Sequence, residues 1–173
     1  MAHLGPKLFR VAIHEAGHAI AFLAHGRKID AIILDGDGKG GRVLPADEPS
    51  SIKSEAIITL AGLMAEHVAW EKGELVEPPV PLPSFNKIPL EEKVDDESKY
   101  RSNVNALQQH QPGSTRTGID RSLKHETRDL VEANWEHIMR IAHAFDSVRW
   151  RTDAFNQVSK TLTGVDINTI LKT

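Results

Sequence analysis

Apolar residues recur at helical spacing near the start of the chain. They stand three or four positions apart between Pro6 and His25, which is the spacing of one helix face. Pro6 suits the first turn of a helix, and Gly26 suits the residue after its end. The pattern therefore predicts a helix over 6–25.

Two short apolar runs follow, separated by a cluster of glycine and aspartate. The first covers 29–34 and is rich in isoleucine, and the second covers 42–45. The cluster between them, 35–41, is typical of a tight turn. We expect two paired strands, and thus a small β-hairpin or sheet next to the first helix.

A second, almost wholly apolar stretch begins after Ser50 or Ser51, either of which can cap a helix. It predicts a well-buried helix that runs to about Lys72 and ends at Gly73. The segment 74–89 holds five of the nine prolines, so it can be neither a regular helix nor a central strand.

The rest of the chain is mostly helical by pattern. We expect one helix within 90–110, a long helix over 119–145, a further helix over 152–162 and a last turn over 165–171. The predicted fold class is α+β and mainly helical, with a helical C-terminal half. The whole chain, 1–173, is interpreted as a single domain in which 74–115 is a long insertion or loop.

Composition narrows the functional classes. The 173 residues include 21 basic and 24 acidic side chains, a formal charge of −3, and no cysteine. This weak field argues against a nucleic-acid partner, and the missing cysteines exclude thiol nucleophiles and Cys-ligated zinc. The longest nearly apolar run, 57–65, is far shorter than the roughly 20 residues of a membrane span, and the N-terminus lacks a signal-peptide pattern. We expect a cytoplasmic protein without a membrane partner.

The first predicted helix contains the motif His14-Glu15-Ala16-Gly17-His18, which is HExxH. Residues four apart lie on one helix face, so both imidazoles can bind one metal ion. Glu15 projects about 100° round the helix, where it can act as general base on a metal-bound water. Zinc suits imidazole ligands, and the small residues of the motif leave room for a neighbouring element.

A catalytic zinc site needs a third protein ligand and an open position. The extended motif HExxHxxGxxH is absent, so this ligand must come from elsewhere in the chain. Glu66 on the second helix and Asp120 near the start of the long helix are both candidates, and spacing does not decide between them. The remaining candidates are three histidines, His67, His110 and His125.

Several stretches together resemble a known family. They are HEAGHA (14–19), AIIL (31–34) with GRVLP (41–45), AGLMAE (61–66), TGID (117–120), LVEANW (130–135) and GVDI (164–167). In this order they are similar to the peptidase domain of FtsH-type ATP-dependent zinc proteases, over nearly the whole chain. HEAGHA is the most specific element.

The resemblance implies that His14, His18 and Asp120 bind Zn2+ and that Glu15 is the general base. It leaves Glu66 a supporting role, such as accepting a hydrogen bond from a ligating histidine. The chain departs from the family in several respects. Leu63 and His67 stand where the family has an arginine and an acidic residue, and TGID is two residues shorter than the family's TGAxND and lacks its Asn. In addition, 73–117 is longer than the family's connection, and no GxxxxGK[ST] phosphate loop is present.

The function that follows is a zinc metalloendopeptidase that hydrolyses peptide bonds of unfolded or flexible protein segments. The alternatives are a zinc-bearing binding or regulatory module, which docks on a separate ATPase or holds unfolded segments without cutting, and a hydrolase of non-peptide amides. By analogy with the family, we expect a homo-oligomer, such as a hexamer, or a separate ATPase partner.

Two segments have open interpretations. Ile32–Leu34 or Arg42–Leu44 could be a strand edge that pairs with an extended substrate, or both could belong to an ordinary small sheet. Val76–Pro89 is interpreted as a solvated loop, with docking of a partner or overhang of the active site as alternatives.

Overall fold

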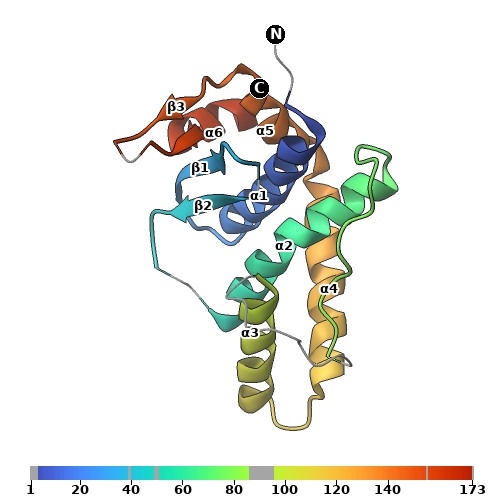
Figure 1. Ribbon diagram of the computed structural model, residues 1–173. Coiled ribbons are helices and arrows are strands. Elements are labelled where there is room, and N and C mark those ends of the chain that lie inside the picture. The colour runs from blue at the N-terminus through green and yellow to red at the C-terminus, as the bar shows by residue number, and fades with distance from the viewer. Residues whose placement is uncertain (1–3, 39, 49–50, 86–95, 155, 173) are drawn as a thin grey trace.

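The structure, a computed structural model, describes residues 4–38, 40–48, 51–85, 96–154 and 156–172 (Figure 1). Within these ranges the elements are α1 (Pro6–Ala24), β1 (Ile29–Asp35), β2 (Gly41–Pro45), α2 (Ile52–Glu71), α3 (Asp96–His110), α4 (Arg116–Ala133), α5 (Trp135–Ser147), β3 (Arg151–Thr152), β4 (Val158–Thr163) and α6 (Gly164–Lys172). The prediction of a mainly helical α+β fold is confirmed.

Helix α1 lies between the sheet on one side and α2 on the other (Figure 1). The crossing of α1 and α2 is close because small residues meet there. A Cβ on Gly17 would stand 2.6 Å from the carbonyl oxygen of Ala61 and 2.7 Å from the Cβ of Ala65. The small residues of the motif predicted room for a neighbouring element. That element is α2.

Helix α2 begins as predicted, because the Ser51 side chain accepts a hydrogen bond from the backbone N–H of Ser54 at 3.1 Å. It packs against α1, α3 and α4. These three contacts explain why the helix carries apolar residues on almost all of its sides. Gly73 follows its end with a φ of +80°, a backbone conformation that glycine adopts without strain.

The strands form one antiparallel sheet in the order β2-β1-β4-β3. The predicted pair of strands is confirmed, with Ile33 opposite Arg42. Strand β1 is interior, since β4 pairs with its other edge, where Ile32 lies opposite Leu162. Of the two proposed substrate edges, Ile32–Leu34 is therefore covered, and β2 is left at the edge of the sheet in the described part of the chain.

The predicted helix over 152–162 is wrong, because this segment forms the β3–β4 hairpin. Burial in β4 alternates, with Lys160 and Leu162 buried and Thr161 only partly so. This two-residue period suits a strand with one covered face. Pairing with the apolar strand β1 satisfies the backbone of both strands, an advantage that local propensity does not reveal.

The single long helix predicted over 119–145 is also wrong, because the chain breaks at Asn134 into α4 and α5. The Asn134 side chain donates a hydrogen bond to the carbonyl oxygen of Leu130 at 2.9 Å, which satisfies a helix-end acceptor. The apolar stripe continues across the break, so the periodicity alone does not show it. The predicted last turn is confirmed as α6.

The long insertion over 74–115 contains one described helix, α3, and a segment without helix or strand at 74–85. Most of the side chains over 74–85 are exposed or partly buried, with Leu75 and Pro83 buried, and the remaining predicted loop residues, 86–89, lie outside the described part. None of the helices in the described ranges combines the length and apolar character that crossing a membrane requires.

Candidate metal centre

The two histidines of the HExxH motif lie one turn apart on α1, so both imidazoles leave the helix on the same side. His18 is buried and His14 partly buried. Their Nε2 atoms are 3.0 Å apart, and their rings meet edge to face with centroids 4.7 Å apart. The helix therefore directs two imidazole nitrogens toward one point.

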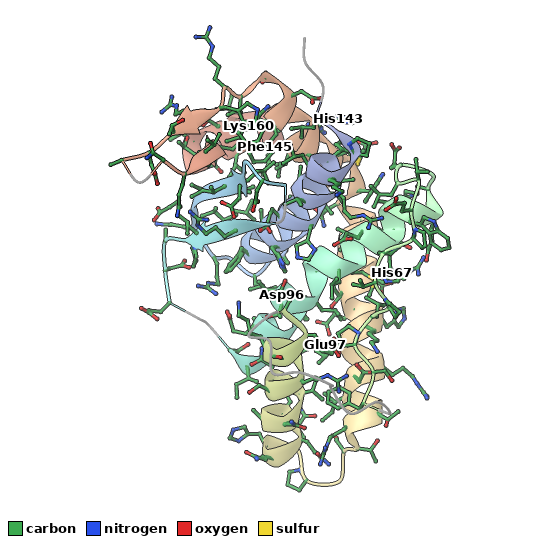
Figure 2. The ribbon with its side chains drawn as sticks, in the orientation of Figure 1. His67, Asp96, Glu97, His143, Phe145 and Lys160 are labelled. Carbon is green, nitrogen blue, oxygen red and sulfur yellow. The ribbon has the colours of Figure 1, made fainter. Side chains whose placement is uncertain are left out.

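A carboxylate from a distant part of the chain completes the group. Asp96 is the first residue of α3 and lies at the end of that helix nearest α1 and α2 (Figure 2). Its Oδ2 stands 3.1 Å from the Nε2 of His14 and 3.1 Å from the Nε2 of His18. The three atoms form a nearly equilateral triangle. Among the described residues, His14, His18 and Asp96 thus form a group that could hold a metal ion.

Helix α2 holds the other nitrogen of each imidazole. The Nδ1 of His14 lies 2.6 Å from Oε1 of Glu66, and the Nδ1 of His18 lies 2.7 Å from the carbonyl oxygen of Ile58. A carbonyl oxygen only accepts hydrogen bonds, and a carboxylate does the same. Each Nδ1 therefore carries the proton, and in the neutral imidazoles each Nε2 presents a bare lone pair.

When both imidazoles are neutral, two bare nitrogens and one carboxylate oxygen converge, an arrangement that either a proton or a metal ion relieves. Zinc binds histidine nitrogens at about 2.0–2.1 Å in a tetrahedron, which places neighbouring ligand atoms about 3.3 Å apart. The observed sides of 3.0 to 3.1 Å lie within a few tenths of an ångström of that value. The donor set fits a divalent metal.

Gly62 on α2 provides the space beside this triangle. A Cβ at this position would stand 2.5 Å from the Nε2 of His18 and 2.6 Å from the Nε2 of His14. Both distances are far below van der Waals contact, so any side chain here would displace the two imidazoles. The absence of a side chain at Gly62 is therefore part of how the centre is built.

The electrostatics of these residues also favour a bound positive charge. Burial by itself lowers the pKa of His14, but hydrogen bonds to Asp96 and Glu66 outweigh it and raise the pKa to about 10. Burial would raise the pKa of Asp96, but the bonds to His14 and His18 hold that pKa well below its usual range. The carboxylate is thus kept charged, and the site attracts a positive charge, either a proton or a metal ion.

Glu15 lies on the same helix and is buried, with an exposed fraction of 6 %. Burial raises the pKa of its carboxyl, against the opposing effect of His18 and His14. The start of β2 packs on its side chain, since a Cβ on Gly41 would stand 2.8 Å from the Cγ of Glu15. Glu15 is thus placed between the histidine pair and the edge strand of the sheet.

The structure does not bring Asp120 into this group. Its Oδ1 accepts a hydrogen bond from the Tyr100 hydroxyl at 2.9 Å, and its Oδ2 pairs with the Lys124 ammonium at 2.8 Å. Asp120 therefore ties α4 to α3, and Asp96 stands where the sequence analysis expected Asp120.

Asp96 was missed by sequence reasoning, although a weak signal was present. Asp96 and Glu97 open a polar helix in the region where one was expected. Acidic residues at the start of a helix are common because they interact favourably with the helix dipole. The same pattern is therefore typical of an ordinary helix start and does not identify a ligand.

The other candidate ligands lie elsewhere. Glu66 contacts the far nitrogen of His14, which matches the supporting role that the resemblance implied. The His67 Nε2 lies 2.9 Å from the carbonyl oxygen of Val80, and His125 pairs with Asp129 at the surface. His110 is the last residue of α3, at the end opposite Asp96.

Comparison with protein-family models gives no match to this chain, and comparison with curated proteins gives none either. The class of site is thus defined by its own geometry: two histidines of an HExxH helix and one aspartate, beside a buried glutamate.

Proposed function

We propose that this chain is a zinc-dependent metallopeptidase that hydrolyses peptide bonds in unfolded or flexible segments. One observation carries the proposal: the Nε2 atoms of His14 and His18 and the Oδ2 of Asp96 converge, with Glu15 next to them on α1. Three protein ligands leave a fourth position open, as catalytic zinc sites require.

His14, His18 and Asp96 would hold the ion. When bound, such an ion polarises the scissile carbonyl and makes water acidic enough to attack it near neutral pH. Zinc is the ion we propose, because two imidazoles and one carboxylate form a typical catalytic zinc set.

Glu15 does the proton transfer in this proposal. Its carboxylate takes a proton from the attacking water while the water oxygen bonds to the carbonyl carbon. Glu15 then gives that proton to the amide nitrogen, and the C–N bond breaks to leave a carboxylic acid and an amine. The raised pKa of Glu15 supports this role, since a base works best when its pKa approaches the working pH.

The position of β2 at the edge of the sheet is an argument for a peptide as the substrate. Its outer edge has no partner strand among the described residues, and it begins at Gly41 against Glu15. An extended peptide could add to Arg42–Leu44 as a further strand, which would carry its backbone past the general base. The location in the cytoplasm and the homo-oligomer or ATPase partner stay predictions.

The test is cleavage of casein by the zinc-loaded chain, with Glu15→Gln as the matched control. We expect the wild type to cut, and Glu15→Gln to retain its zinc but lose activity by about 100-fold or more, since it cannot take the proton. A zinc-loaded, folded wild type that cuts neither casein nor short peptides would instead favour the binding or regulatory module.

A further inference from the structure

A proline-rich stretch of the insertion, residues 77–84, which we call the strap, leaves the end of α2 and runs beside α4 (Figure 1). Prolines have no backbone N–H, so the strap offers mainly carbonyl oxygens. Side chains from four helices donate to those oxygens: Arg10 on α1, His67 on α2, Arg101 on α3 and Lys124 on α4.

Arg10 differs from the other three because it also reaches the candidate metal centre. It stands one turn before His14, on the same side of α1. Its NH2 group donates to the carbonyl oxygens of Glu77 and Pro78, and its Nε lies 3.7 Å from Oε2 of Glu66. The other oxygen of the same carboxylate, Oε1, lies 2.6 Å from the Nδ1 of His14.

The Glu66 carboxylate is thus held between a ligating histidine and a guanidinium. The guanidinium is a rigid planar fork, and the strap carbonyls hold its far side. This arrangement restricts the rotation of Glu66, and through it the ring of His14. Partners of this kind fix the tautomer and orientation of a metal-binding histidine.

We propose that Arg10 is a positioning residue of the metal centre, which orients His14 through Glu66 and takes its own orientation from the strap. The inference rests on the proposed metal site. The remaining three strap contacts hold the same segment without touching Glu66, so they serve as internal controls.

The test is zinc affinity, measured by competition with a chromogenic chelator. For Arg10→Ala we expect a loss of about tenfold, the lower end for partners outside the metal's own ligands. Arg10→Lys keeps the charge but not the fork, so we expect partial rescue, to a loss of about threefold. His67→Ala removes the contact at Val80 but leaves the contacts of Arg10 with Glu77 and Pro78 in place, so it should leave the affinity unchanged.

A double-mutant cycle separates the proposed route from others. If Arg10 acts through Glu66, Arg10→Ala should weaken zinc binding in the wild type but not in a Glu66→Ala background. An equal loss in both backgrounds would overturn the proposal, as would an equal loss in Arg10→Ala and His67→Ala. Arg10→Lys covers the case in which Arg10→Ala fails to fold, and wild-type affinity in that variant would then count against the proposal.

The experiments distinguish failure of the proposed function from failure of the proposed role of Arg10. A wild type that binds zinc but cuts neither casein nor short peptides refutes the peptidase activity and leaves the role of Arg10 standing. A wild type that binds zinc, with unchanged affinity in Arg10→Ala, refutes only the role of Arg10. A wild type that binds no zinc refutes both.

Discussion

Helix α1 presents His14 and His18 from its middle, whereas α3 presents Asp96 from its first residue. The histidine side chains are 17 % and 10 % exposed, and Asp96 is 29 % exposed. α2 supports both imidazoles with an acceptor for each Nδ1. Helix ends open at a lower free-energy cost than packed helix middles. We therefore expect the histidine side of the centre to be rigid and the Asp96 side to be adjustable.

The largest expected effect tests which aspartate completes the centre. Asp96→Ala removes the proposed ligand of the adjustable side, so we expect zinc affinity to fall by about 100-fold or more, beyond the range for outer partners. Asp120→Ala should leave zinc affinity unchanged but lower the free energy of unfolding by about 1–3 kcal/mol, since Tyr100 loses its acceptor. Chelator competition and urea unfolding measure the two quantities. The reverse result would restore Asp120 as the ligand.

The next effect concerns the rigid side. Gly62→Ala places a Cβ against both imidazoles, so we expect zinc affinity to fall by about 10- to 100-fold and the protein to lose about 1–3 kcal/mol from overpacking. Gly5→Ala is the matched control, because a Cβ there meets nothing within 4 Å. Tight zinc binding by Gly62→Ala would show that this side is not rigid.

A smaller expected effect is the pH dependence that arises because a proton and a metal ion compete for His14. In the metal-free protein the pKa of His14 is raised to about 10 from 6.5, so its contribution to stability is present in full below pH 6.5 and is lost as the pH rises toward 10. Zinc competes with that proton, so zinc affinity should rise over the same range.

The measurement is urea unfolding from pH 6.5 to 8.5, with chelator or with zinc. We expect the stabilisation by zinc to grow with pH, and the contribution of His14 to the metal-free stability to decline. Zinc stabilisation that is constant across this range would contradict a protonated His14 in the metal-free centre.

The smallest expected effects come from two helix caps, one on α2, which supports the histidines, and one on α4, which packs against α3. Ser51 caps α2 and Thr115 caps α4, each through a hydrogen bond from the backbone N–H three residues ahead. Ser51→Ala and Thr115→Ala should each lower the free energy of unfolding by about 1 kcal/mol. Neither cap touches the centre, so zinc affinity should stay the same. A change in affinity for Thr115→Ala alone would show that the α3–α4 end controls Asp96.

Much of the rigid side was predictable from the sequence, because its signals act over short distances. His14 and His18 share a helix face because they are one turn apart, and the small residues around Gly17 indicated a closely packed neighbouring element. The strand pair of β1 and β2 followed from two apolar runs around a glycine turn. Each of these depends on residues close together in the chain.

The less predictable parts depend on contacts between distant residues. The segment 158–163 has a sequence that suits either a helix or a strand, and it becomes β4 because the far edge of β1 needs a partner. Asn134 ends α4 inside a continuous apolar stripe. Asp96 resembles an ordinary helix start, while Asp120 has the same residue type in a more familiar sequence context.

The sequence by itself therefore determined that His14 and His18 share one helix face with Glu15 beside them, and that the fold is mainly helical α+β, because i to i+4 geometry and residue periodicity are local. The tertiary structure alone decided that Asp96 rather than Asp120 meets the histidines, 82 and 78 residues away along the chain. It also decided that Arg10 links the strap to Glu66. These contacts depend on how α1, α2 and α3 pack, and packing is a property of the whole core rather than of any one segment.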